Sequence, residues 1–164
     1  MSARIQKLVM FTAYPSAGKT TLSKYLAETA GYERISLDDM LGDLDQDDVE
    51  IMLPTWVRNA THKNLLEGRN VVIDSTMPSS VSRQYYFDTQ IPCEKYLIWL
   101  RTNPSKTYKR TSQRAWTQKS IEQWKVSERW EDPVSGDYTL FILTNNTPDD
   151  LETVKRTLLE KLSN

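Results

Sequence analysis

The sequence has only one cysteine, only one histidine and no long apolar run, and each of these features argues against a class of protein. Cys93 has no second cysteine to pair with, so an internal disulfide is excluded and a reducing, cytoplasmic location is expected. His62 has no cysteine neighbour, which argues against a zinc site. No apolar stretch approaches the roughly 20 residues that cross a bilayer, and the run from Leu8 to Phe11 is too short for the core of a signal peptide. We therefore expect no membrane partner.

The remaining composition is that of an ordinary globular domain. The 164 residues carry a formal net charge of −1, and 38% are hydrophobic. A chain of this length suits one domain with its own core, and with no repeat or linker we expect a single domain over residues 1–164. The charge is uneven, because Asp38 to Glu50 is acidic whereas Arg101 to Arg129 is mostly basic. Such runs are usually solvated faces; a basic flap over a phosphate site is the alternative.

Apolar periodicity predicts short strands that alternate with helices. The expected strands cover residues 7–12, 33–37, 71–74, 95–100 and 138–143. The expected helices cover residues 18–30, 49–66, 80–88, 104–116 and 149–162, and residues 117–130 are expected to be helical or irregular. Strands and helices that alternate in this way form a mostly parallel sheet with helices on both faces. The predicted fold class is therefore α/β.

A glycine-lysine loop separates the first predicted strand from the first predicted helix. Its sequence, AYPSAGKT from Ala13 to Thr20, is close to the phosphate-binding pattern G-x-x-x-x-G-K-[ST]. Ala13 replaces the first glycine and would resist a positive φ there. The N–H groups at a helix N-terminus bind anions, Lys19 can reach the β- and γ-phosphates, and the Thr20 hydroxyl can join the shell of a magnesium ion. The expected nucleotide-binding residues are Ala13, Pro15, Ser16, Ala17, Gly18, Lys19, Thr20 and Thr21.

Acidic residues follow the second and third predicted strands. Asp38 and Asp39 come after the second strand, and Asp74 ends the third. The carboxyl ends of parallel strands face the ligand crevice of an open α/β sheet, where a carboxylate can accept the proton of an attacking hydroxyl. Asp38 or Asp39 could instead cap the next helix. Asp74 fits the acidic position that holds magnesium, directly or through water.

Two arginines are expected to close over the nucleotide from a lid at about residues 104–130. Arg110 and Arg114 lie four residues apart on a predicted helix and so share one face. The planar guanidinium suits phosphate, and charge on a transferring phosphoryl group calls for cationic contacts. The alternative is a solvated basic helix face. Thr76 and Arg83, which follow the third strand, are further candidates for contact with a substrate.

Taken in order, these segments resemble the P-loop kinases related to polynucleotide 5′-hydroxyl kinases, a group with the seryl-tRNA kinases and zeta-toxins as relatives. The resemblance is carried by AYPSAGKTT, SLDDM, EGRNVVIDSTM, YLIWLRTNP and the helix with Arg110 and Arg114. It implies a three-layer sandwich around a five-stranded parallel sheet, ATP and Mg²⁺ as cofactors, and Asp38 as the catalytic aspartate. The arginine that polynucleotide kinases carry three residues after that aspartate is Leu41 here.

The resemblance implies a kinase whose acceptor is a hydroxyl on nucleic acid, either a 5′ end or a hydroxymethylated base. Trp116, Trp124 and Trp130 lie among basic residues and could stack on bases, although packing on the core is the commoner role. A small-molecule acceptor (a nucleoside, sugar or antibiotic) is the alternative, because the acidic stretch after Asp38 would repel a polyanion. A nucleotide-binding ATPase or switch is a third possibility, and no protein partner is evident. The predicted catalytic residues are Lys19, Asp38, Arg110 and Arg114.

Overall fold

The computed structural model describes residues 4–42, 46–103 and 118–163. In these residues one parallel sheet has the strand order β2-β3-β1-β4-β5. Its strands are β1 (Gln6–Ala13), β2 (Glu33–Ser36), β3 (Val71–Asp74), β4 (Cys93–Arg101) and β5 (Thr139–Thr144). The predicted α/β class and the five-stranded parallel sheet are confirmed.

Strand β1 occupies the centre of the sheet because its sequence can be buried on both faces. All its residues from Lys7 to Ala13 are buried, as is typical of a parallel strand covered by helices on both sides. Leu8 lies opposite Val71 of β3 and opposite Lys95 of β4. The residue after β1 therefore emerges at the middle of the carboxyl edge of the sheet, between the ends of β3 and β4.

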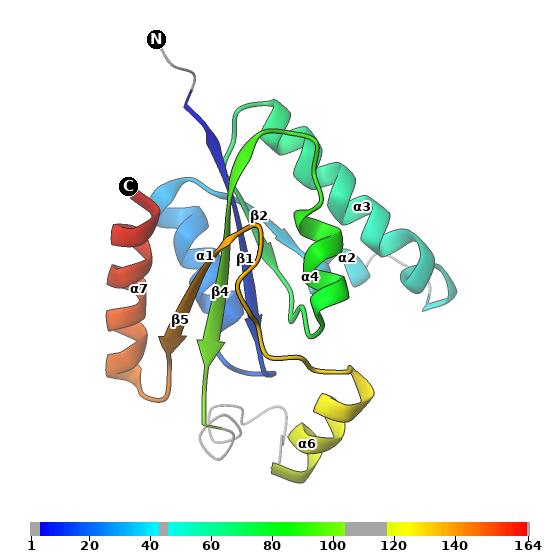
Figure 1. Cartoon of the computed structure of the whole chain (residues 1–164), viewed down its shortest axis with the longest axis vertical. Helices are drawn as coiled ribbons and strands as arrows, with labels where there is room; N and C mark the ends of the chain where they lie inside the picture. Colours follow the sequence, from blue (N-terminus) through cyan, green and yellow to red (C-terminus); the bar gives the residue numbers. More distant parts are fainter. Residues whose placement is uncertain (1–3, 43–45, 104–117, 164) are drawn as a thin grey trace.

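Helices cover both faces of the sheet, and the core is divided accordingly (Figure 1). On one face, Val9 and Phe11 of β1 pack with α1 (Lys19–Ala30) and α7 (Pro148–Ser163). On the other face, Leu8 and Met10 pack with α3 (Gln46–Leu66) and α4 (Ser80–Phe87). This division follows from the alternation of side chains along a strand. The three-layer arrangement expected from the sequence is thus observed.

Most predicted elements agree with the structure to within three residues at each end. The exception is α2 (Leu37–Leu41), which is a helix of five residues where the sequence predicted the end of a strand at Leu37. The Ser36 hydroxyl caps α2 by accepting a hydrogen bond from Asp39 N at 3.3 Å. The predicted helix over residues 104–116 lies outside the described residues. After it, α6 (Gln118–Ser127) confirms helical structure in the stretch from 117 to 130.

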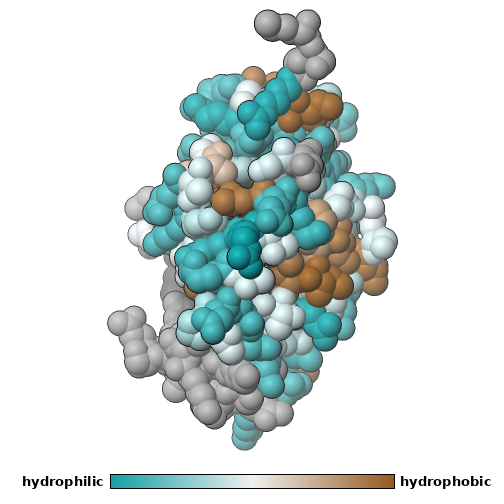
Figure 2. All heavy atoms as spheres, turned by 90° about the vertical axis from the view of Figure 1, so that its left-hand side faces the viewer, coloured by the Kyte–Doolittle hydropathy of each residue, from teal (hydrophilic) through white to brown (hydrophobic). Residues whose placement is uncertain are grey.

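The surface on the side of α7 and β5 is largely hydrophilic, with smaller hydrophobic areas between the polar ones (Figure 2). Large apolar side chains that stay exposed come from separate elements, for example Leu66 at the end of α3 and Val126 in α6. Among the residues that the structure describes, no helix combines the length and the apolar character needed to cross a membrane.

Candidate active site

The glycine-lysine loop joins the end of β1 to the start of α1 at the carboxyl edge of the sheet. Two of its residues have left-handed backbone conformations: Ser16 with φ 63° and Gly18 with φ 102°. Gly18 is the residue before the first turn of α1, whose first residue is Lys19. The loop therefore turns the chain so that the unpaired N–H groups of the first turn of α1 face the crevice, where they can bind an anion.

Ala13, which replaces the first glycine of the phosphate-loop pattern, does not need the positive φ that an alanine would resist. It is the last residue of β1 and pairs with Leu100 of β4, so its backbone is extended. Its N–H donates to the carbonyl of Thr76 at 3.4 Å, which ties the loop to the connection after β3. A glycine is therefore not required for backbone reasons at position 13.

Lys19 is the buried cation of the loop. Its side chain is 9% exposed, and burial lowers the pKa of Lys19 to about 8, although the negative charges of Asp74 and Asp38 act in the opposite direction. Asp74 and Asp38 offset the effect of burial only in part. A phosphate group would add further negative charge beside the ammonium group.

A cleft of about 460 Å³ lies beside the loop. It is lined by the residues from Ser16 to Thr21 and by the β5–α7 connection with Thr147 and Pro148. Its volume falls within the range of small-molecule sites. The exposed Thr20 and Thr21 side chains lie at this opening. The predicted nucleotide-binding residues from Ser16 onward are thus brought to one cleft, while Ala13 and Pro15 are buried behind it.

Asn145 was not predicted from the sequence, yet it supports the loop. It is 1% exposed, and its carboxamide Nδ2 donates to the carbonyl of Ala17 at 2.8 Å. Its backbone N–H donates to Arg101 O at 2.9 Å at the end of β4. The side-chain oxygen of Asn145 is buried and has no hydrogen-bond partner in the described part of the chain. The loop and the β5–α7 connection are therefore fixed to each other.

Replacing Gly18 with alanine is expected to destabilise the fold by about 1–3 kcal/mol. A Cβ at Gly18 would lie 2.7 Å from Asn145 Nδ2, and the residue would keep a φ of 102°. Gly31→Ala is the matched control, because Gly31 also has a positive φ but nothing lies within 4 Å of its Cβ position. Thermal unfolding of both variants measures the difference. Equal losses would show that the contact with Asn145 contributes nothing.

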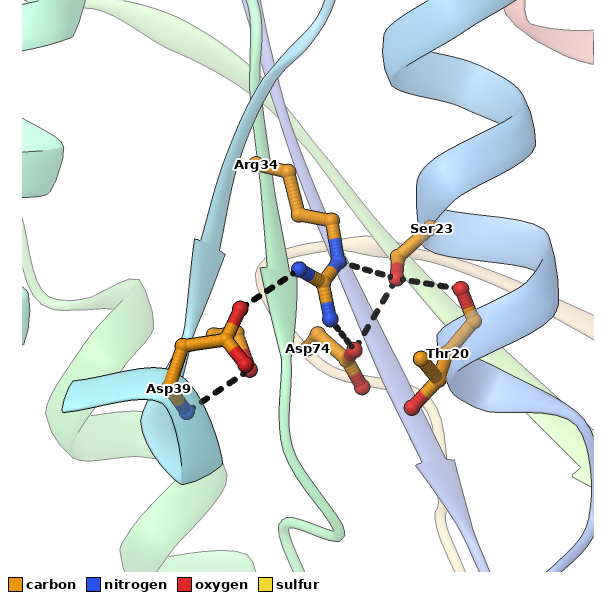
Figure 3. Close-up of polar contacts among 6 residues, drawn as sticks. Thr20, Ser23, Arg34, Asp39 and Asp74 are labelled. Carbon is orange, nitrogen blue, oxygen red and sulfur yellow. Dashed lines mark hydrogen bonds and ion pairs between the residues drawn. The ribbon is translucent and has the colours of Figure 1, made fainter. Parts of the chain in front are cut away.

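Asp74, predicted to bind magnesium, is held by two donors on one oxygen (Figure 3). It is 6% exposed at the end of β3. Its Oδ2 accepts from Ser23 Oγ at 3.0 Å and from Arg34 Nη2 at 2.5 Å. Arg34 also donates from Nε to Ser23 Oγ and from Nη1 to Asp39 Oδ2, both at 2.9 Å. Arg34 was not predicted from the sequence as a site residue.

Asp38 and Asp39 occupy the first turn of α2, beside the carboxyl ends of β2 and β3. Neither is the helix cap, because Ser36 has that position. The Asp39 side chain is 71% exposed and forms the ion pair with Arg34. Asp38 is exposed and close enough to Lys19 to raise the pKa of that lysine. The structure therefore gathers Lys19, Asp38 and Asp74 around one end of the sheet.

Arg83, predicted to contact substrate, is bound to the protein itself. It is 2% exposed, and its Nη1 lies 3.3 Å from both Thr12 Oγ1 and the carbonyl of Met77. Its Nη2 donates to Glu131 O at 2.8 Å, and desolvation lowers its pKa. Arg83 also borders a second cavity of about 460 Å³ between α4 and residues 131–138. Its observed contacts join β1, the β3–α4 connection and the segment after α6, and a substrate role for Arg83 or Thr76 stays a prediction.

An aromatic cluster connects the loop to α6. The Tyr14 ring lies 4.8 Å from Trp130 and 6.2 Å from Trp124, and the two indoles are 5.8 Å apart. Lys125 lies over the Tyr14 ring at 5.3 Å. Both indoles are partly buried by these contacts, which is closer to the packing role than to base stacking. Trp116, Arg110 and Arg114 lie outside the described residues, so the lid arginines stay predictions.

The residues at the end of β3 and the start of α1 suit magnesium. In the described residues there is no group of three or more histidine, cysteine or acidic side chains that could enclose a metal ion. Magnesium needs none, because it keeps several waters and is held by one or two protein groups together with substrate phosphates. Figure 3 shows the Thr20 hydroxyl and the second oxygen of Asp74 pointing to the same end of the sheet. This hydroxyl and carboxylate pair fits the predicted Mg²⁺ site.

One family model and several curated proteins match most of this chain. A family model described as an AAA domain matches residues 9–131, which include the loop, Asp38 and Asp74. A "Putative adenylate kinase" from Thermococcus onnurineus is 28% identical over 121 residues. The match covers 71% of this chain and 60% of the relative, so the chain spans less than two thirds of that protein.

Solved structures of kinases share the fold over almost the whole chain. A protein from Chloroflexus aurantiacus described as a "putative kinase" has a TM-score of 0.74 at 18% identity, covering 98% of this chain and 97% of its own. A sugar kinase from Janibacter sp. has a TM-score of 0.72 at 15% identity, with 98% and 95% covered. A shikimate kinase from Bacteroides thetaiotaomicron has a TM-score of 0.62 at 21% identity, with 96% and 98% covered. At these identities the matches establish the P-loop kinase fold, and the predicted cofactors, ATP and Mg²⁺, agree with it.

Proposed function

Because this chain belongs to the AAA-domain family matched over residues 9–131 and has the P-loop kinase fold, we propose that it is an ATP- and Mg²⁺-dependent phosphotransferase. The acceptor in this proposal is a hydroxyl of a small molecule. One observation carries the proposal. A dehydrated lysine, Lys19, stands at the N-terminus of α1, with the carboxylate of Asp74 at the end of β3 and that of Asp38 in the first turn of α2 close to it.

Each residue has a separate task in this proposal. The N–H groups of the loop and the ammonium of Lys19 bind the phosphates of the nucleotide. Thr20 and Asp74 would hold a magnesium ion, which would supply positive charge opposite the phosphates. Asp38, exposed in the first turn of α2, accepts the proton of the acceptor hydroxyl. Arg110 and Arg114 would stabilise the charge of the transferring phosphoryl group.

A small acceptor is supported over the nucleic acid that the sequence first suggested. The kinases of similar fold include a sugar kinase and a shikimate kinase. From residue 118 to residue 138 the chain has three basic and five acidic residues, so the described part of this segment would not attract a polyanion. Trp124 and Trp130 are engaged by Tyr14. These features all favour the alternative over a nucleic-acid substrate.

The curated relatives suggest a second candidate, transfer to the phosphate of a nucleoside monophosphate. The Thermococcus proteins are described as putative adenylate kinases. In that reaction the acceptor is already ionised, so no base is needed, and the exposed Asp38 would have no proton to accept. A nucleotide-binding switch or ATPase that transfers phosphate only to water is the third candidate.

Transfer of labelled γ-phosphate from ATP to a panel of acceptors tests the proposal. The panel contains sugars, sugar acids, nucleosides, AMP, and DNA and RNA with 5′-hydroxyl ends. We expect label on a small hydroxyl compound, and Lys19→Met as control should remove it. Label on nucleic acid alone, on AMP alone or only in free phosphate would each contradict the small-hydroxyl assignment and would identify the corresponding alternative.

The affinity for ATP is expected to fall about tenfold for each pH unit above 8. In the free protein the pKa of Lys19 is about 8, and bound phosphates raise it. Binding therefore requires uptake of a proton above pH 8 and little uptake below it. Isothermal titration calorimetry between pH 7 and 9.5, in buffers that differ in ionisation enthalpy, measures both effects. Lys19→Met should show no such pH dependence, and an equally flat profile for the wild type would contradict the assignment.

A further inference from the structure

Arg34 is placed by the register of the sheet beside Asp74. Ser36 lies opposite Asp74 and Arg34 opposite Val72 in the parallel pair of β2 and β3. Residues two apart on a strand point to the same face, so the Arg34 side chain runs along the face covered by α1 toward Asp74. Its three contacts reach α1 through Ser23, α2 through Asp39 and β3 through Asp74 (Figure 3).

The contacts of Arg34 also determine which part of Asp74 can meet a metal ion. Arg34 and Ser23 both donate to Oδ2. In Figure 3 the other oxygen of Asp74 points away from Arg34, toward the end of the sheet at which the Thr20 hydroxyl lies. The carboxylate is thus oriented with one oxygen toward the protein and one toward the predicted magnesium site.

The contacts of Arg34 also compensate the charge of Asp74. A buried carboxylate is costly unless it is paired, and Asp74 has two cations near it. Arg34 is in direct contact, and Lys19 is close enough for Asp74 to raise its pKa. A divalent cation that approaches the site without a nucleotide meets a carboxylate whose charge is already offset in part by Arg34, which Asp74 shares with Asp39. The phosphates of ATP would supply the missing negative charge.

We propose that Arg34 is a positioning residue that serves as the resident counter-charge of Asp74, so that the protein takes up Mg²⁺ only together with nucleotide. The proposal rests on the proposed function, because that function assigns the metal to Thr20 and Asp74. The Arg34 guanidinium pairs with Asp74 and orients it when the metal is absent. It also weakens the attraction of the nucleotide-free site for a free cation.

Binding of Mn²⁺ to the nucleotide-free protein, measured by the loss of the free-ion electron paramagnetic resonance signal, tests this directly. The wild type should bind Mn²⁺ weakly alone and much more tightly with the ATP analogue AMPPNP. Arg34→Gln should bind Mn²⁺ at least about tenfold more tightly without nucleotide. Arg34→Lys, which keeps the charge, should remain close to the wild type.

Two control variants test whether the gain in Mn²⁺ affinity of Arg34→Gln comes from Asp74. Arg156→Gln removes the same charge from the exposed face of α7 and should leave Mn²⁺ binding unchanged. Adding Asp74→Asn to Arg34→Gln should abolish the gain in Mn²⁺ affinity, because Asp74 is the carboxylate that loses its paired cation in Arg34→Gln. Binding by Arg34→Gln that is equal to or weaker than that of the wild type would overturn the proposal. So would a gain in Arg34→Lys as large as that in Arg34→Gln.

If Arg34→Gln does not fold, as judged by circular dichroism, the wild type decides the question. Tight Mn²⁺ binding at one site without nucleotide, lost in Asp74→Asn, would contradict the proposal. Weak binding that becomes tight with AMPPNP would support it. None of these titrations depends on turnover, so failure to phosphorylate any acceptor would contradict the proposed function and not the role of Arg34.

Discussion

Replacing Lys19 with methionine is expected to lower the rate of phosphoryl transfer about 10³-fold and, at the same time, to stabilise the nucleotide-free protein. Methionine keeps the length and apolar stem of lysine but removes the charge that binds the phosphates. The loss should therefore appear in turnover and in ATP affinity, because in the proposed function Lys19 would contact the nucleotide in both the ground and the transition state. Steady-state kinetics and ATP titrations measure the two losses separately.

The gain in stability follows from the burial of Lys19. Its pKa falls from 10.5 to about 8 in the folded protein, so folding disfavours the charged form. At pH 7 this costs up to about 3 kcal/mol, a penalty that is fully present below pH 8 and disappears as the pH rises toward 10.5. Thermal unfolding of Lys19→Met at pH 7 should therefore occur at a higher temperature than that of the wild type, and the difference should shrink at pH 10. A variant less stable than the wild type at pH 7 would contradict this account of the lysine.

Replacing Asp38 with asparagine is expected to reduce turnover by roughly 10² or more without weakening ATP binding. Asparagine fills the same space in the first turn of α2 but cannot accept a proton from a hydroxyl. Asp38 is exposed, and it is not the helix cap, so the substitution should leave the fold unchanged. Single-turnover kinetics with the acceptor identified by the labelling experiment measures the chemical step.

Asp39→Asn is the matched control for Asp38→Asn. It removes the same charge from the adjacent residue, but the Asp39 carboxylate is already paired with Arg34 at 2.9 Å. We expect a much smaller effect on turnover, since Asp39 is not available as the base. If Asp39→Asn proves to be the more damaging of the two, the base is Asp39. Full turnover in both variants would favour an acceptor that needs no base, such as the phosphate of AMP.

The sequence predicted β1 and β3 well because each contains a short apolar run with a clear end. The run LVMF in β1 and the whole of β3, which reads VVID, are buried. It did not predict α2, because five residues are too few for helical periodicity to appear. Ser36, which caps α2, is a residue type that favours the start of a helix. The prediction of an extended strand through Leu37 did not take this into account.

For the candidate site, local motifs were predictable and contacts between distant segments were not. Lys19, Thr20 and Asp74 stand at fixed places relative to strand ends, so a pattern in the chain identifies them. Asn145 contacts the loop from a position 128 residues away, and no local pattern indicates such a pairing. The bridge from Arg34 to Asp74 depends on the register of β2 against β3, which only the assembled sheet determines.

The central position of β1 has a consequence for how the chain is synthesised and folded. β1 is made before its partners β3 and β4, which begin at Val71 and Cys93. The middle of the sheet therefore cannot form until the residues after Cys93 have been made, and folding depends on contacts between distant segments, which slows it. Until then the apolar run from Leu8 to Phe11 has no strand to pair with. The nascent chain thus has its greatest tendency to aggregate before β4 is complete.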